Sequence, residues 1–544
     1  MTIYQKTAAI LFFGIMATLS LSPWSFWFCG FIMLVPLFYM LEKETFSIKQ
    51  SIKMGYFFTL SFNIFISYWL IYTISIYGHL HWTIAVIVFL LYTLITCLRY
   101  TIFILLIQAW KYLSEKGFPA LPRILQNRYF SWTFFWGVSE YFGWQLFHAL
   151  GANHAMGDFL LIQTADLVGI YGLSLIWFLI NLLLYDALKW VTIKARRLDN
   201  RVSFEKKSMI FTLVLTVAMH IYGYYAIAME RERTSMYKTK LIGIVQGRAP
   251  LAFESEKSVS SQIMDTLKTQ AKLTESLMEN GMAAGKKPDL VVWSESSVPF
   301  LSFQRSSIFS KTISELQNKY KMAIIINDIY VDVNMQKYYN NLWLLNGNGK
   351  IIDFYHKIRL LPFGEFIPLG NYFPGFYRYV PEIAGFSPGT EKKLLDLDGL
   401  KILPSICYEL LPPDFTLDFF KKSGKHSQII INITNDTWFG DTIENAQHLQ
   451  GSSLRAIELR LPIVRATNSG ISAYIDTLGK VHNPIKSNIQ DTRIYEIPIP
   501  DKSHSLYSFW GLWPYYLFLV IGSLLWSFPL YNIYIAGRKF RTKK

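Results

Sequence analysis

The sequence predicts a membrane protein of two parts: an α-helical bundle of eight spans and an extracytoplasmic α/β domain. Three observations support this fold class. Hydrophobic residues make up 52% of the 544-residue chain and its mean hydropathy is +0.24, values typical of membrane proteins. Many of the apolar residues gather in long uninterrupted runs. Between residues 230 and 508 these runs give way to strand-length segments separated by polar connections, which indicates a water-exposed domain.

Eight apolar runs are long enough to cross about 30 Å of hydrocarbon as helices. The first ends near Ser22 and resembles a signal peptide, but the chain continues directly into a second run at 26–41. We therefore predict a hairpin of two spans that turns at Ser22-Pro23. The other runs cover 54–76, 82–110, 129–149, 159–188, 209–228 and 510–535.

Lysines and arginines occupy alternate loops between these runs, and the formal net charge is +15. The connections 77–81 and 150–158 contain neither residue type. Because positive charge collects on the cytoplasmic side of a membrane, the alternation places both termini in the cytoplasm and residues 230–508 outside it. The same clustering argues against nucleic-acid binding, which needs a basic face. The basic residues are Lys43, Lys49, Lys53, Lys111, Lys116, Arg123, Arg128, Lys189, Lys194, Arg196, Arg197, Arg201, Lys206, Lys207, Arg538, Lys539, Arg541, Lys543 and Lys544.

Strands and helices alternate in the extracytoplasmic stretch, which predicts a layered α/β domain. Amphipathic helices are expected over 255–281 and 445–461, where apolar residues recur at helical spacing. We predict domain boundaries at 1–229, 230–508 and 509–544. The expected strands are Leu241–Gln246, Leu290–Ser294, Ala323–Asn327, Leu342–Leu345, Ile402–Ile406, Ile429–Ile433, Ile463–Ala466 and Ser472–Ile475.

Three strand ends carry residue types that acyl transfer can use: Cys407, Glu295 and Lys357. A thiol at the mouth of a strand can act as a nucleophile, with the next backbone N–H directed at a developing oxyanion. Each residue also has a plainer explanation, as a buried structural cysteine, a strand-end carboxylate and a surface lysine. The other two cysteines, Cys29 and Cys97, fall in apolar runs, so we expect no disulfide framework.

Several further motifs occur together with this Glu/Lys/Cys set. The set itself resembles the carbon–nitrogen hydrolase, or nitrilase, superfamily. The whole chain is similar to the apolipoprotein N-acyltransferase family of bacterial inner membranes, in which a nitrilase-like domain lies between seven N-terminal spans and one C-terminal span. The resemblance covers nearly the full length and implies an α-β-β-α sandwich for residues 230–508. The motifs that carry it are Ile162–Asp166, Gly169–Gly172, Val245–Gly247, Pro362–Glu365, Cys407–Glu409, Asn435–Asp441 and Arg465–Gly470.

The resemblance implies a two-step acyl transfer without metal or organic cofactor. Cys407 would attack the ester carbonyl of a phospholipid, typically phosphatidylethanolamine, and form a thioester. The acyl chain would then pass to the α-amino group of a diacylglyceryl-cysteine on an apolipoprotein. The expected partners are these two substrates and the bilayer, and a monomer is expected.

Each candidate residue has an expected role. A free thiol with a pKa of about 8.5 is mostly protonated at neutral pH, so Cys407 needs a base, and Glu295 is the candidate. Lys357 would stabilise the oxyanion together with the backbone N–H of Tyr408. Glu365 and Glu409 would orient the lysine and the thiol region.

Three segments depart from the family pattern. Ser294 stands where proline is usual, Arg248–Phe253 lacks a tryptophan, and Gly151–His154 lacks a Pro-Trp pair. None of these changes removes a catalytic group. The loop Phe366–Ile383 is rich in aromatic residues, glycine and proline, and is either a mobile gate or a static packed loop.

Arg99 and Glu140 interrupt otherwise apolar runs. Because isolated charges at that depth are costly, we expect the two side chains to pair across adjacent spans.

Two other functional classes remain open. A membrane-tethered amidase would keep Glu295, Lys357 and Cys407 but use water as the acceptor; the eight-span architecture and the extended motifs argue against it. A transporter or receptor with a degenerate sensory domain would need none of the three residues.

Overall fold

The computed structural model describes residues 1–115, 121–147, 150–195, 205–250, 258–299, 301–367, 370, 372 and 385–541. The chain forms two compact units. The first, called here the helical unit, comprises Met1–Ile71, Thr83–Ala226 and Phe509–Lys544. The second, called the α/β unit, comprises Tyr72–Trp82 and Ile227–Ser508.

Helix is present in each of the eight predicted apolar runs. An α-helix satisfies its backbone hydrogen bonds internally, which long apolar segments in lipid require. The helices that build the helical unit or lead out of it are α1 (Ile3–Ser20), α2 (Trp27–Ile32), α3 (Val35–Lys43), α4 (Ile48–Ile66), α5 (Trp69–Ile76), α6 (Trp82–Thr96), α7 (Leu98–Glu115), α8 (Arg123–Gln126), α9 (Arg128–Phe142), η1 (Gly151–Ala155), η2 (Leu161–Thr164), α10 (Ala165–Ala195), α11 (Lys206–Met236) and α17 (Trp513–Arg541).

Four stretches of the described chain are long and apolar enough to cross a membrane: Ile3–Ser20, Trp82–Ser114, Leu161–Ala195 and Lys206–Met236. The pair α4 and α5 would be a fifth, with a bend of 70° between its two helices. Helix α10 is interrupted at Gly169, whose φ of 66° lies in the left-handed region that glycine adopts without steric cost. The protein is therefore a membrane protein.

The predicted pairing of Arg99 with Glu140 is confirmed. The guanidinium group on α7 donates to the Glu140 carboxylate on α9, and both side chains are buried. Glu140 also accepts hydrogen bonds from the Ser174 hydroxyl and, at 2.6 Å, from the Gly151 backbone N–H. This carboxylate therefore joins α7, α9, η1 and α10 within the helical unit.

Two six-stranded sheets form the core of the α/β unit, in the orders β12-β1-β2-β3-β4-β5 and β11-β10-β9-β8-β7-β6. The inner pairs β1–β2, β2–β3, β7–β8 and β8–β9 are parallel. The strands are β1 (Lys238–Gln246), β2 (Leu290–Trp293), β3 (Ala323–Asp332), β4 (Lys337–Leu345), β5 (Ile351–His356), β6 (Leu395–Leu397), β7 (Leu400–Ile406), β8 (Ile429–Thr434), β9 (Ile463–Thr467), β10 (Ser472–Ile475), β11 (Val481–Ile485) and β12 (Asp491–Ile499).

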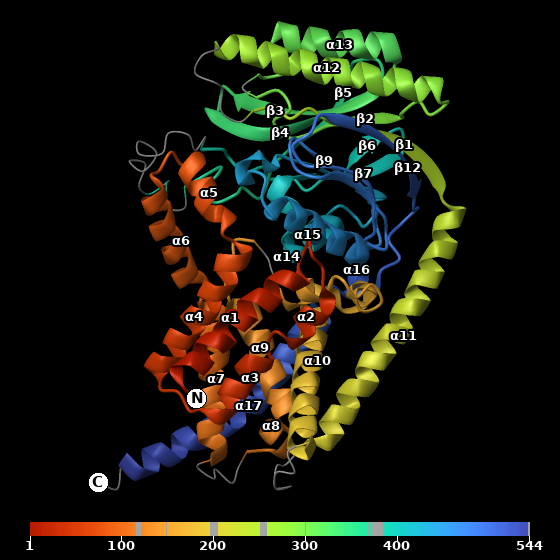
Figure 1. The fold of residues 1–544 in the computed structure, drawn as a ribbon. Coiled ribbons are helices and arrows are strands. Elements are labelled where there is room, and N and C mark those ends of the chain that lie inside the picture. The colour runs from red at the N-terminus through yellow and green to blue at the C-terminus, as the bar shows by residue number, and fades with distance from the viewer. Residues whose placement is uncertain are drawn as a thin grey trace. The chain divides into compact units, whose positions relative to one another are not determined.

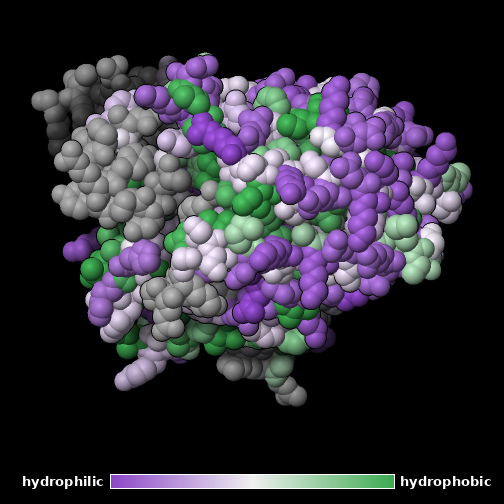
Figure 2. All heavy atoms as spheres, turned by 90° about the horizontal axis from the view of Figure 1, so that it is seen from above, coloured by the Kyte–Doolittle hydropathy of each residue, from purple (hydrophilic) through white to green (hydrophobic). Residues whose placement is uncertain are grey.

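Helices cover the sheets on their outer sides, as Figure 1 shows. Helices α12 and α13 lie side by side over the first sheet, where Leu277 and Phe309 join a buried cluster that includes Trp293 and Ile324. Seen from above in Figure 2, the face over these helices is mostly hydrophilic, as their amphipathic sequences require. The helices of this unit are α12 (Val259–Ala283), α13 (Ser307–Tyr320), η4 (Cys407–Leu410), α14 (Pro413–Lys422), η5 (Asp436–Phe439), α15 (Glu444–Leu459) and α16 (Leu506–Trp510), which continues into the helical unit.

The two sheets face each other, and polar side chains join them at one end. The Gln246 side-chain oxygen on β1 accepts hydrogen bonds from Thr467 at 3.1 Å and Ser472 at 2.5 Å, both from the second sheet. The layers are therefore helices, sheet, sheet and helices, the α/β sandwich expected from the resemblance.

The α/β unit includes a segment that the sequence assigns to two spans and the turn between them, residues 72–82. The Thr73 hydroxyl donates to the Trp438 carbonyl at 3.0 Å, and the Tyr77 hydroxyl donates to the Thr437 carbonyl at 2.7 Å. These contacts with η5 were not predicted, because nothing in a short uncharged connection indicates which loop it will contact.

Candidate active site

Cys407 lies at the junction between β7 and the short helix η4. Its φ is +54°, in the left-handed region that residues other than glycine rarely adopt. The side chain is buried, and the Cys407 carbonyl accepts a hydrogen bond from the Asn432 side chain at 3.3 Å. A strained residue at the end of a strand is a common feature of functional sites.

Lys357 follows β5 and lies between two carboxylates. Its Nζ atom is 3.4 Å from Glu295 and 2.9 Å from Glu365, and the lysine side chain is 1% exposed. Burial alone would lower the pKa of Lys357, but the two carboxylates outweigh it and raise that pKa. Lys357 is therefore a buried permanent cation.

Glu295 follows β2 and Ser294, and its carboxylate contacts both Lys357 and Cys407. The Cys407 thiol lies beside it, and the Asn340 side chain donates to it at 2.7 Å. Burial and the negative charge of Glu365 raise the pKa of Glu295, although Lys357 acts in the opposite direction. The structure thus brings the three sequence-predicted residues Glu295, Lys357 and Cys407 together in one buried cluster.

The thiol is held in its neutral form. Burial raises the pKa of Cys407 above its ordinary value, and the charge of Glu295 adds to this effect. A neutral thiol needs a base to become a nucleophile, and the carboxylate beside it has a raised pKa suited to accepting a proton.

Glu409 connects the helix that begins at Cys407 to the loop that follows Lys357. Its carboxylate accepts hydrogen bonds from the backbone N–H groups of Ile358 at 2.6 Å, Arg359 at 2.9 Å and Ile406 at 2.9 Å. The Tyr355 hydroxyl donates to it at 2.9 Å. Burial raises the pKa of Glu409 to about 7. Tyr408 follows Cys407 in η4, and its ring lies 6.0 Å from the Arg359 guanidinium.

Asn340 is a member of this cluster that sequence reasoning missed. Its side-chain N–H groups donate to Glu295 at 2.7 Å and to Glu365 at 3.0 Å, so it holds the two carboxylates on either side of Lys357. Its backbone carbonyl also accepts from the Lys357 N–H at 2.9 Å. Two consecutive asparagines in a strand, Asn340 and Asn341, are a signal that could have indicated it, since asparagine is disfavoured in strands.

The structure describes only some residues of the segments that depart from the family pattern. Ser294 is fully buried between β2 and Glu295, and Arg248 has a φ of +54°. Residues 251–253 lie outside the described residues, as do residues 255–257 of the predicted helix. Most of the loop Phe366–Ile383 also lies outside them.

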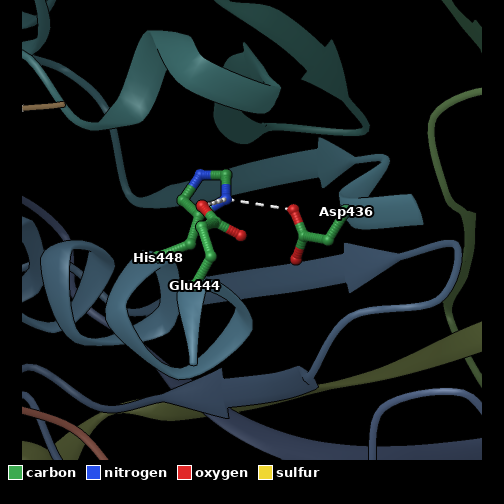
Figure 3. A group of neighbouring side chains, drawn as sticks. All are labelled: Asp436, Glu444 and His448. Atoms are coloured by element: carbon green, nitrogen blue, oxygen red, sulfur yellow. Dashed lines mark hydrogen bonds and ion pairs between the residues drawn. The ribbon is translucent and has the colours of Figure 1, made fainter. Parts of the chain in front are cut away.

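A second buried polar cluster lies beside the thiol. Asp436 on η5 and His448 on α15 are joined by a 3.0 Å hydrogen bond, and Glu444 lies one turn before His448 (Figure 3). The three residues offer ligand atoms within 4.8 Å of one another, a spacing that a metal ion could use. The Arg465 guanidinium, however, donates to Asp436 at 2.7 Å, so a cation already balances this carboxylate. The donor set therefore fits a closed ion pair better than a metal site.

The sequence matches two family models. Residues 241–501 match carbon–nitrogen hydrolase, and residues 13–183 match the apolipoprotein N-acyltransferase N-terminal domain. Apolipoprotein N-acyltransferase 2 of Leptospira interrogans serogroup Icterohaemorrhagiae is 27% identical, over 96% of this chain and 97% of the relative. Among solved structures, a branch 10 member of the nitrilase superfamily from Saccharomyces cerevisiae is 18% identical with a TM-score of 0.37, over 51% of this chain and 95% of the other.

A further relative has a higher sequence identity with this chain. Apolipoprotein N-acyltransferase 2 of Treponema denticola is 30% identical over 70% of this chain and 71% of its own length. Together with the two matched domains in their expected order, this shows that the chain belongs to the apolipoprotein N-acyltransferase family.

Proposed function

We propose that the chain transfers an acyl chain from a phospholipid to the N-terminal diacylglyceryl-cysteine of lipoproteins, through a thioester on Cys407. Family membership makes it an N-acyltransferase and supplies the substrate classes. The observation that carries the mechanism is the contact of a buried neutral thiol with a carboxylate of raised pKa, beside a lysine held as a cation.

In the first half-reaction, Glu295 takes the proton of Cys407 as the sulfur attacks the ester carbonyl of the phospholipid. Lys357 and the Tyr408 backbone N–H stabilise the oxyanion of the tetrahedral intermediate. The intermediate collapses by breaking the ester C–O bond, and the proton on Glu295 goes to the departing lysophospholipid. The acyl group remains on sulfur as a thioester.

In the second half-reaction, the α-amino group of the diacylglyceryl-cysteine attacks the thioester carbonyl. Glu295 accepts a proton from the amine and returns it to the leaving thiolate, which regenerates the thiol. Glu365 and Glu409 hold Lys357 and the η4 helix in place through the hydrogen bonds described above. Every proton transfer in this scheme is assigned to a side chain, and the scheme invokes no metal and no organic cofactor.

The topology belongs to the same proposal. Eight spans, with a periplasmic domain over 230–508 flanked by membrane parts at 1–229 and 509–544, place the thiol outside the cytoplasm of a bacterial inner membrane. The alternation of basic loops supports this arrangement, as does the presence of helix in every predicted span. Both termini then face the cytoplasm, and the enzyme acts as a monomer.

The function is tested by following the mass of the intact enzyme. Purified full-length protein is incubated with phosphatidylethanolamine vesicles, and a diacylglyceryl-cysteine peptide with a free amino group is then added. We expect the mass to rise by one acyl group, and to return to its starting value as the peptide becomes N-acylated.

The control variants are Cys407→Ala, which should form no adduct, and Cys97→Ala, a buried cysteine of the helical unit, which should behave as wild type. Absence of an adduct, or an equal adduct on Cys407→Ala, would contradict the proposal. An adduct that hydrolyses without N-acylating the peptide would indicate the amidase instead.

A further inference from the structure

Arg465 occupies a central position in the second sheet, two strands away from the nucleophile's strand. It lies opposite Asn432 of β8 in the parallel register, and Asn432 lies opposite Ser405 of β7. The three residues therefore form a row across adjacent strands that ends two residues before Cys407. The arginine side chain is fully buried.

The first connection from Arg465 reaches the backbone of Cys407. One guanidinium nitrogen donates to the Asn432 side-chain oxygen at 2.9 Å. The amide nitrogen of the same Asn432 donates to the Cys407 carbonyl at 3.3 Å and to the Ser405 hydroxyl at 3.3 Å. Because the arginine fixes which way this amide faces, it also fixes the donor that holds the Cys407 carbonyl.

The second connection leads to Thr434, which lies next to the sulfur. The other terminal guanidinium nitrogen donates to Asp436 at 2.7 Å, and the Thr434 hydroxyl donates to the second oxygen of that carboxylate at 3.2 Å. Thr434 also lies next to the Cys407 thiol and lowers its pKa, against the larger effect of burial. One guanidinium is thus linked to the surroundings of Cys407 through two separate paths, one ending at the Cys407 carbonyl and one at Thr434 beside the thiol.

This arrangement matters because the nucleophile's backbone is strained. Cys407 has a φ of +54°, and such a conformation persists only where the surroundings fix it. A buried ion pair adds little net stability compared with apolar packing of the same volume, so stability alone does not account for Arg465 and Asp436 at this place. The planar fork of arginine, which can bind two acceptors in fixed directions, suits a positioning role.

We propose that Arg465 is a positioning residue for the acylation step, holding Cys407 in its strained conformation through Asn432 and through Asp436 with Thr434. The proposal rests on the proposed role of Cys407 as the nucleophile. Arg465 touches neither the substrate nor the sulfur, and its effect on the reaction passes through these three side chains.

The first test is Arg465→Lys, which keeps the positive charge beside Asp436 but loses the fork that also reaches Asn432. The measurement is the single-turnover rate at which Cys407 of the full-length enzyme gains an acyl group from phosphatidylethanolamine vesicles. We expect this rate to fall about 10- to 100-fold, because a nucleophile misplaced by about 1 Å loses rate on this scale. The KM for phospholipid should stay within about twofold, since the lipid contacts are unchanged.

The matched control is Arg460→Lys. Arg460 is equally buried and donates to the Thr477 carbonyl at 3.0 Å, five residues before Arg465 in the chain. Its acylation rate and KM should equal those of wild type. A rate loss in this control as large as that of Arg465→Lys would show a general effect of altering a buried arginine, and would overturn the proposal.

A second variant keeps the test decisive if Arg465→Lys does not fold. Thr434→Val has nearly the same shape and a side chain suited to a strand, and it cuts only the path to the thiol. We expect a smaller rate loss, about tenfold, with unchanged KM and unchanged thermal unfolding. In the double variant, the two losses should multiply, because Arg465→Lys cuts the path through Asn432 and Thr434→Val cuts the path through Asp436 and Thr434.

Three results decide between the possibilities. If wild-type Cys407 gains no acyl group, the proposed function itself fails. If wild type is acylated and Arg465→Lys or Thr434→Val reacts at the same rate, only the positioning role is overturned. A double variant no slower than the slower single variant would also overturn it, since it would show that the two substitutions do not cut separate paths.

Discussion

The α/β unit holds two buried clusters of charge beside one thiol, and they are balanced differently. In the first, the carboxylates of Glu295 and Glu365 share the single cation Lys357. In the second, the single carboxylate of Asp436 forms an ion pair with Arg465, and His448 is a further hydrogen-bond partner of this carboxylate. The first cluster therefore has one negative charge in excess of its cation, and the second pair is neutral.

This difference appears in the direction of the pKa shifts. Burial and Glu365 raise the pKa of Glu295, whereas Arg465 and His448 overcome burial and lower the pKa of Asp436. Burial also raises the pKa of Glu444 well above its ordinary value, so this third acid keeps its proton. Glu295 therefore accepts a proton more readily than Asp436 does. Burial of charge therefore does not distinguish the two clusters; the excess negative charge of the first one does.

The sharpest test of this comparison removes one carboxylate from each cluster. Asp436→Asn takes away the carboxylate that balances buried Arg465 and should lower the free energy of unfolding by about 3–5 kcal/mol. Glu295→Gln removes the excess charge, so it should leave stability unchanged or raised. Thermal unfolding of both variants in the same detergent measures the difference, and equal losses would show that the clusters do not differ.

The next largest effect is expected on the rate. Lys357→Ala removes the cation that we propose to stabilise the oxyanion, and it should slow acylation of Cys407 by about 10²–10³-fold. The control is Lys319→Ala, at a half-exposed lysine that pairs with Glu275 and Glu279 on the surface. A single-turnover assay should show no change for the control. An Lys357→Ala enzyme within tenfold of wild type would leave the oxyanion role without support.

A smaller effect is expected from Glu365→Gln. The negative charge of Glu365 helps to raise the pKa of Glu295, so its removal should lower that pKa. Glu295 must be ionised to act as a base, and acylation is therefore lost as pH falls through its pKa. The acid limb of the pH–rate profile should move to lower pH in this variant. A limb that stays in place or moves upward would contradict the coupling.

The raised pKa of Glu295 has opposite effects on the acylation rate and on stability as the pH rises. Because folding raises the pKa of Glu295, the folded state favours the protonated acid. This contribution to stability is complete below the unfolded pKa and is lost as pH rises through the raised folded pKa. Glu295 is thus ionised, as the proposed base must be, in the pH range where it no longer stabilises the fold.

Much of the fold could be predicted from the sequence, and the strands show why the rest could not. All eight predicted strands are present, while β5, β6, β11 and β12 were not among them. These four are the outer strands of the two sheets. An outer strand exposes part of its surface to water, as the alternating burial of β12 shows, so it lacks the continuous apolar run that marks an inner strand.

The residues of the candidate site also fall into two groups, those that the sequence predicted and those that only the structure revealed. Glu295, Lys357 and Cys407 each follow a strand, and the resemblance to a known family gives all three a common chemistry. Asn340 and Arg465 lie inside strands, where their contacts depend on sheet register. Register between strands far apart in the sequence cannot be read from local pattern, so their roles needed the structure.

The central claim is that Glu295, with a raised pKa, is the base that activates Cys407. It is tested most directly by measuring single-turnover acylation of Cys407 from phosphatidylethanolamine vesicles across pH, in wild type and in Glu295→Gln. We predict a wild-type acid limb with its midpoint above the ordinary glutamate pKa of 4.5, and no such limb in the slower variant. An acid limb that persists unchanged in Glu295→Gln would contradict the account.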